Sequence, residues 1–280
     1  MPTLTSRIGF MQGRLSPQVG DRIQAFPRDH WREEFPIAER LGFPLMEWTL
    51  DYEGMRDNPL LTRAGRDEIA RRAAAHRLRV AALTGDALMQ MPFWKVGSER
   101  DRLVALFDTV LDACAAAKIG VIVVPLVDNG SIASADQARI LGEVLRARAA
   151  RLQRDGLVIA FESDFAPDPL ARFIADYQSS SFGIAYDTGN SAALGYDWRE
   201  EFAAYRARIV HVHVKDRLRA GASVPLGRSG ADIGAALANL EGGGYRGTYV
   251  LQTARAPDGD HAGVLASYRA TTLAWLGAVT

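Results

Sequence analysis

Four short apolar runs in the second half of the chain each carry or precede a polar side chain that can bind a metal ion. These side chains are Glu162, Asp187, His213 and Gln252. Two carboxylates, an imidazole and an amide make an oxygen-rich donor set, which favours Mn, Mg or Co over Zn. Burying two carboxylates without a cation or a paired base would cost free energy. We therefore predict a divalent-cation site, the alternative being four unrelated polar groups satisfied by local hydrogen bonds.

Runs of this kind are typical of buried parallel strands, and the sequence contains eight of them. They are Ile8–Met11, Leu45–Leu50, Val80–Leu83, Val121–Val127, Val158–Glu162, Phe182–Asp187, Ile209–Val214 and Thr248–Gln252. Helical periodicity separates them, as in residues 102–118 and 135–154. No linker or change of composition marks a second domain, so we predict an α/β fold: one closed (β/α)8 TIM barrel covering residues 1–280. Barrel closure would bring the four polar side chains to one mouth.

The alternation of side chains along these strands indicates which of them point into the barrel. Small or polar residues share one face: Ala160 with Glu162; Gly183 with Ala185 and Asp187; His211 with His213 and Lys215. Bulky residues occupy the opposite face, among them Ile159, Phe161, Val210, Val212 and Val214. Because successive side chains point to opposite faces of a sheet, the pattern predicts that the polar residues point inward.

Further candidates for substrate binding lie just after other strands. We expect Glu47 and Asp86 to hydrogen-bond substrate hydroxyls, although Glu47 could instead pair with an arginine and Asp86 could stabilise a turn. Asn190 follows Gly189 and could reach the site or cap the turn. Barrels often bind anions in the sector of the last strands, so four arginines are predicted to form an anion-binding mouth. These are Arg14, Arg217, Arg228 and Arg255.

Composition narrows the possible partners. The chain has 33 basic and 33 acidic residues, and a nucleic-acid binder would usually have a basic excess. No apolar run approaches the roughly 20 residues that span a bilayer, and the absence of an apolar segment in Met1 to Arg7 leads us to expect no signal peptide. The single cysteine suits a reducing compartment. We expect a cytoplasmic protein that binds neither nucleic acid nor membranes, and a homo-oligomer is left open.

The same residues give the chain a resemblance to the xylose isomerase-like TIM-barrel superfamily, the sugar phosphate isomerase/epimerase group. The resemblance covers nearly the whole chain. It rests on residues 11–15 (MQGRL), 47–48 (EW), 162–163 (ES), 187–190 (DTGN) and 213–216 (HVKD). Members of this group are similar in placing a divalent metal on Glu, Asp, His and Glu from strands five to eight. The resemblance thus implies that Glu162, Asp187 and His213 are ligands.

The chain departs from the family pattern at the eighth strand, where Gln252 replaces the usual Glu. In the family's epimerases, two Glu ligands flank the substrate and exchange protons through a cis-enediolate, which the metal stabilises. Gln can coordinate through its carbonyl oxygen but cannot act as a general base. Either Glu162 works alone as the base, or Lys215 or His211 supplies the second proton.

The function implied is a metal-dependent isomerase or epimerase of a small sugar, sugar acid or sugar phosphate. A dehydratase (lyase) of a keto-polyol would begin with the same enolisation. A non-catalytic sugar-binding barrel is the alternative that the loss of the strand-eight carboxylate leaves open. An AP-endonuclease-like phosphodiesterase is disfavoured because it needs several zinc ions and more histidines than His211 and His213 offer.

Overall fold

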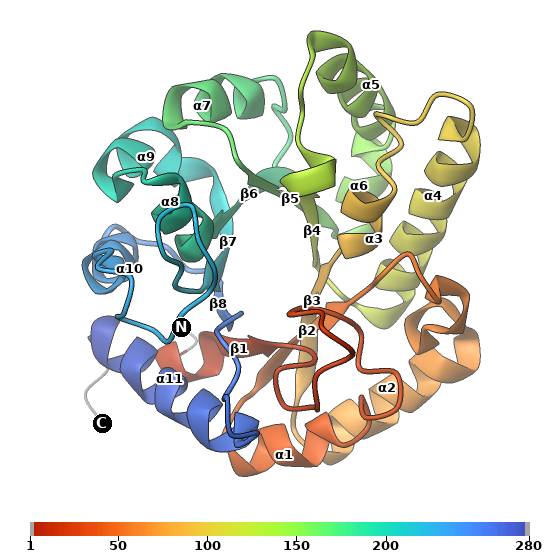
Figure 1. Cartoon of the computed structure of the whole chain (residues 1–280). Helices are drawn as coiled ribbons and strands as arrows, with labels where there is room; N and C mark the ends of the chain where they lie inside the picture. The colour runs from red at the N-terminus through yellow and green to blue at the C-terminus, as the bar shows by residue number, and fades with distance from the viewer. Residues whose placement is uncertain (1–2, 278–280) are drawn as a thin grey trace.

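The eight strands form one closed parallel barrel in the computed structural model, which describes residues 3–277 (Figure 1). They are β1 (Ile8–Met11), β2 (Leu45–Thr49), β3 (Arg79–Thr84), β4 (Val121–Leu126), β5 (Val158–Ser163), β6 (Phe182–Asp187), β7 (Ile209–Val214) and β8 (Thr248–Leu251). Each strand pairs with the next in the chain, and β8 pairs with β1 to close the barrel. The predicted fold class is confirmed, and each predicted strand matches an observed one to within a residue at either end.

The helices form a ring around the barrel (Figure 1). The α-helices are α1 (Glu34–Arg40), α2 (Arg63–Ala75), α3 (Asp86–Gln90), α4 (Arg100–Ala117), α5 (Ala135–Arg146), α6 (Ala149–Asp155), α7 (Pro167–Ala175), α8 (Thr188–Leu194), α9 (Trp198–Tyr205), α10 (Ile233–Gly242) and α11 (His261–Trp275). Short 3-10 helices are η1 (Leu4–Arg7), η2 (Met55–Asp57), η3 (Pro59–Leu61), η4 (Asp128–Gly130) and η5 (Arg206–Arg208). Among residues 3–277, no helix combines the length and apolar character needed to cross a bilayer.

The core has two parts, as the alternation of side chains predicts. The large apolar cluster lies between the strands and the helices and includes Ile159 and Phe161. A small separate cluster contains Val123, Ala160 and Ala185, which carry small side chains on the lumen side of β4, β5 and β6. These small side chains fill the lumen, so the interior of the barrel is packed below its polar mouth.

The predicted facing of Val210 is wrong. Ile184 pairs with Ile209 and Ala185 pairs with His211, so Val210 is an extra residue in β7. Val210 packs against the lumen cluster, whereas Val212 and Val214 join the outer one. Such a bulge shifts the alternation by one residue. Gly183 makes it possible, because a Cβ there would lie 2.5 Å from Val210 Cγ1.

A long loop between β1 and α1 is held in place by the buried Glu34 and the half-buried Arg255. Glu34 accepts hydrogen bonds from the backbone N–H of Gly13 at 2.8 Å and of Leu15 at 2.9 Å. Arg255 donates to the carbonyl oxygens of Gly13 and Ser16. These contacts fix the start of the loop, whose later residues form part of the wall of the barrel mouth.

Candidate metal centre and its cavity

Three of the four predicted ligands converge at the mouth of the barrel. The Nδ1 atom of His213 lies 3.3 Å from Glu162 Oε2 and 3.9 Å from Asp187 Oδ2. All three residues are buried. This Nδ1 atom is buried without a hydrogen-bond partner among residues 3–277. An unpaired buried nitrogen facing two carboxylate oxygens is a donor arrangement that fits a divalent cation.

Asp187 is positioned by the start of α8. It is the last residue of β6, and its Oδ1 atom accepts hydrogen bonds from the backbone N–H of Gly189 at 2.8 Å and of Asn190 at 2.9 Å. The carboxylate thus caps the helix and neutralises its positive N-terminal end. Capping occupies Oδ1 and fixes the rotamer, so Oδ2 is presented to the cluster.

Glu47 lies behind the candidate ligands and contacts both histidines of β7. Its carboxylate is 2.6 Å from His211 Nε2 and 3.1 Å from His213 Nε2, and all three side chains are fully buried. Burial alone would raise the pKa of Glu47, but the charges of His213 and His211 and their hydrogen bonds lower it to about 2. The residue is therefore ionised and accepts both hydrogen bonds.

This pairing determines which nitrogen of His213 carries a proton. A carboxylate only accepts hydrogen bonds, so the Nε2–H of His213 donates to Glu47, and Nδ1 is the nitrogen left to take either a second proton or a metal ion. A histidine that donates to a buried carboxylate while its other nitrogen faces the site is the usual arrangement of a metal ligand. Burial alone would lower the pKa of His213, but Glu47 and Glu162 raise it well above its ordinary value. The negative charge that favours a proton at Nδ1 equally favours a cation there.

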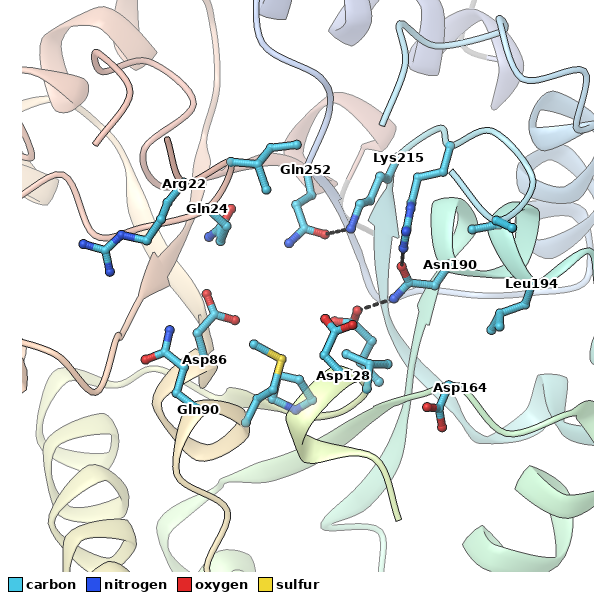
Figure 2. Close-up of a pocket in the computed structure, with 18 of the residues that line it drawn as sticks. Arg22, Gln24, Asp86, Gln90, Asp128, Asp164, Asn190, Leu194, Lys215 and Gln252 are labelled. Atoms are coloured by element: carbon cyan, nitrogen blue, oxygen red, sulfur yellow. Dashed lines mark hydrogen bonds between the residues drawn. The ribbon is translucent and has the colours of Figure 1, made fainter. Parts of the chain in front are cut away.

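Gln252 joins the cluster through Lys215. The Nζ atom of Lys215 donates to Gln252 Oε1 at 3.3 Å (Figure 2) and to Asp187 Oδ2 at 3.4 Å. The ammonium group thus bridges Asp187 at the end of β6 and Gln252 just after β8. The fourth predicted ligand is therefore adjacent to the other three, with its oxygen directed at Lys215.

Glu162 is held from its other side by Asn190. Its Oε1 atom accepts a hydrogen bond from Asn190 Nδ2 at 2.6 Å, and Asn190 Oδ1 accepts one from Arg217 at 2.9 Å (Figure 2). Burial alone would raise the pKa of Glu162, but His213 and then Lys215 lower it. An ionised, oriented carboxylate at the cavity wall is suited to accept a proton from a bound molecule.

A cavity of about 840 Å³ lies above the cluster and is large enough for a small sugar (Figure 2). Its acidic side chains follow three consecutive strands, β3 to β5: Asp86, Asp128, Glu162 and Asp164. Its basic side chains come mainly from the loop after β7: Lys215, Arg217, Arg219 and, from the loop after β1, Arg22. The wall is therefore segregated by charge, with donors for an anionic group on one side and acceptors for hydroxyl groups on the other.

Asp86 is the first residue of α3 and points into the cavity across from Lys215 and Asn190 (Figure 2). Its side chain accepts a hydrogen bond from Thr84 Oγ1 at 3.4 Å. Burial, followed by the charges of Asp51, Glu162 and Glu47, raises the pKa of Asp86 to about 7. A carboxyl group with this pKa can give or accept a proton near neutral pH.

The elevated pKa of Asp86 predicts a pH-dependent stability. The folded protein binds this proton more tightly than the unfolded chain. The resulting stabilisation is fully present below about pH 4 and is lost as the pH rises through about 7. An elevation from 3.8 to about 7 corresponds to at most about 4 kcal/mol. Urea unfolding with chelator present should show wild type losing stability relative to Asp86→Asn between pH 4 and 8. A difference independent of pH would contradict this.

Several predicted site residues do not line the cavity. His211 and Glu47 are fully buried behind the ligands, and His211 Nδ1 is engaged by Thr248 Oγ1 at 3.1 Å. Arg14 is buried and donates to the carbonyl of Ile23, while Arg255 holds the loop after β1. Arg228 is exposed outside the cavity. The positions of these residues do not support their predicted contact with substrate, whereas Asp86, Asn190 and Arg217 do line the cavity.

The sequence analysis missed other residues of the cavity wall. Asp128 and Asp164 each follow a barrel strand within two residues, the same position that identified Glu162 and Asp187. Arg219 lies two residues beyond Arg217. Gln24 and Gln90 carried no such signal, because they lie within a long loop and at the end of a short helix.

The sequence model of the family described as Xylose isomerase-like TIM barrel matches residues 35–271. The chain belongs to this family. Among solved structures, this xylose isomerase-like barrel is similar to 3-keto-D-glucoside 4-epimerase from E. coli, at 19% identity over 98% of this chain and 99% of that chain, with a TM-score of 0.69.

Two further solved structures were determined with a metal. A xylose isomerase-like TIM barrel protein from Mycobacterium smegmatis, in complex with magnesium, is 16% identical over 100% of both chains, with a TM-score of 0.72. The IOLI protein with a zinc atom is 15% identical over 97% of this chain and 98% of that chain, also at 0.72. At these identities the similarity establishes a shared fold. No curated protein matches the sequence.

Proposed function

We propose that this protein is a metal-dependent isomerase or epimerase of a small sugar, sugar acid or sugar phosphate. One observation carries the proposal: His213 Nδ1, which has no hydrogen-bond partner among residues 3–277, faces Asp187 and Glu162, and Glu162 also lines a polar cavity. Family membership supports it, as does the activity named for the similar 3-keto-D-glucoside 4-epimerase.

The ligands of the cation would be Glu162, Asp187 and His213, with the amide oxygen of Gln252 as the fourth. An oxygen-rich set with one imidazole favours Mg, Mn or Co over Zn. When bound, a divalent cation would polarise the carbonyl of the substrate and stabilise the negative charge that develops on its oxygen. Magnesium and zinc in the two similar proteins support a metal-binding role without selecting between these ions.

Glu162 is assigned as the base that removes a proton from the carbon beside the substrate carbonyl. Its low pKa keeps it ionised, and its hydrogen bond to Asn190 fixes the oxygen that would receive the proton. Arg217 holds Asn190 from behind, so the three side chains form one chain of hydrogen bonds. Lys215, beside Asp187 and Gln252, is placed to donate to the developing negative charge.

The charge segregation of the cavity suggests how a substrate is oriented. A carboxylate or phosphate group would lie near Arg217 and Arg219, because guanidinium groups bind such anions through paired N–H donors. Hydroxyl groups would then face Asp128 and Asp164. This arrangement keeps Arg217 from the anion-binding mouth inferred from the sequence, leaves out the other three arginines and adds Arg219.

The proposal is tested by metal analysis followed by a product assay. Protein purified without chelator should contain near-stoichiometric Mg, Mn or Co, or bind Mg or Mn on titration, and Glu162→Ala should not. The loaded protein is then incubated with D-fructose, D-tagatose, D-fructose 6-phosphate, D-ribulose 5-phosphate and D-tagaturonate. An isomer or epimer supports the proposal, and loss of water would assign a dehydratase. Failure to bind either ion would overturn it.

Replacing Gln252 with Glu should increase cation affinity about tenfold or more. The substitution converts a neutral ligand into a carboxylate and completes a Glu, Asp, His, Glu set. In the same position the new charge would pair with Lys215 Nζ, which now lies 3.3 Å from Gln252 Oε1. Calorimetric titration with Mn measures the affinity, with Gln90→Glu in the same cavity as the control. An unchanged affinity in Gln252→Glu would remove this residue from the ligand set.

A further inference from the structure

An epimerase that inverts a carbon needs two proton-transfer groups on opposite faces of the substrate, and Glu162 supplies only one. Gln252 cannot supply the second because an amide does not titrate. His211 cannot supply it either, because the residue is fully buried and its two nitrogens are engaged by Glu47 and Thr248. Lys215 is held against Asp187 and Gln252, on the same side of the cavity as Asn190 (Figure 2).

Asp86 occupies the position that remains. It comes from the end of β3 and faces Lys215 and Asn190 across the cavity, and Asn190 is the residue bonded to Glu162 (Figure 2). A substrate seated between these walls would therefore have Glu162 on one face and Asp86 on the other. Asp86 Oδ1 accepts a hydrogen bond from Thr84 Oγ1, and the carboxyl group lines the cavity.

We propose that Asp86 is the second proton-transfer group and acts as the acid on the substrate face opposite Glu162. This inference rests on the proposed isomerase or epimerase function. The pKa of about 7, caused by burial and by neighbouring carboxylates, supports it, because a fraction of Asp86 then carries a proton at neutral pH.

The step is balanced in protons and electrons. Glu162 takes a proton from the carbon beside the carbonyl, and the electron pair of the broken C–H bond forms a C=C bond as the carbonyl π pair moves onto oxygen. Asp86 then gives its proton to the opposite face of that carbon, where a new C–H bond forms as the C=O bond is restored. Glu162 ends protonated and Asp86 ionised, and both exchange protons with water before the next turnover.

The experiment separates proton removal from proton delivery. Mg-loaded protein is incubated in D2O with the panel sugar that wild type converts, and NMR measures two rates. One is the exchange of substrate hydrogen for deuterium, and the other is product formation. In Asp86→Asn, product formation should fall about 100-fold while exchange stays within about threefold of wild type, because Glu162 still removes and returns a proton on its own face.

The control is Asp168→Asn, which makes the same change at an exposed position of α7 outside the cavity wall and should keep both wild-type rates. Asp86→Ala is measured beside Asp86→Asn, so that the ratio is obtained if either variant fails to fold. If the Asp86 variants lose hydrogen exchange and product formation equally, or keep both, the role of Asp86 is overturned, while the proposed isomerase or epimerase function still stands. If wild type exchanges hydrogen from no panel sugar, the proposed function fails and the assignment of Asp86 fails with it.

Discussion

Replacing Glu162 with Gln should reduce turnover about 1,000-fold and abolish hydrogen exchange into the substrate. A positioned general base contributes roughly 10²–10⁴-fold to rate, and an amide cannot accept the proton. The amide also disturbs the site, because Asn190 Nδ2 donates to Glu162 Oε1 at 2.6 Å. A glutamine there would have to keep its oxygen toward Asn190 and turn its NH2 group toward His213 Nδ1.

The hydrogen exchange distinguishes this variant from Asp86→Asn. If Glu162 removes the proton, Glu162→Gln stops both exchange and product formation, whereas the Asp86 variant stops product formation alone. Asp168→Asn is the matched control, because Asp168 is an exposed carboxylate on α7, outside the cavity wall. Turnover by Glu162→Gln above a tenth of the wild-type rate would assign the base to another residue.

The fold was predictable because each strand is buried by helices on one side and by the lumen on the other. Parallel strands in that position are apolar along their length, so their runs stand out in the sequence. The convergence of the three candidate ligands was predictable for a related reason. Glu162, Asp187 and His213 lie at the carboxyl ends of consecutive strands, and closure of the barrel brings such positions to one mouth.

The sequence did not reveal which polar residues line the cavity and which ones lie behind them and hold them in position. Glu47 and His213 share the same pattern and are both fully buried, but the carboxylate of Glu47 contacts the two histidines, whereas His213 Nδ1 faces Glu162. The arginines were misplaced for a different reason. The direction of Arg14 and Arg255 depends on the path of the loop after β1, which Glu34 determines through contacts distant in sequence. Strand alternation says nothing about such loops.

Replacing Glu47 with Gln should weaken cation affinity about 100-fold, at the upper end of the loss expected from residues that orient a metal ligand. Glu47 now accepts from the Nε2–H groups of both His211 and His213. A glutamine has one acceptor oxygen, so its NH2 group would face one of these N–H donors. If that histidine is His213, its proton moves to Nδ1, and the lone pair facing Glu162 and Asp187 is lost.

The same substitution should lower the free energy of unfolding by about 3 kcal/mol, because it removes one partner of a fully buried ionic group. Stability and affinity must therefore be measured separately, by urea unfolding with chelator and by calorimetric titration with Mn. Glu34→Gln is the matched control: Glu34 is also fully buried, but it accepts from backbone N–H groups of Gly13 and Leu15 and does not contact the ligands. It should lose stability and keep its affinity for Mn. Equal affinities in both variants would mean that Glu47 contributes packing and charge to the fold but does not orient His213.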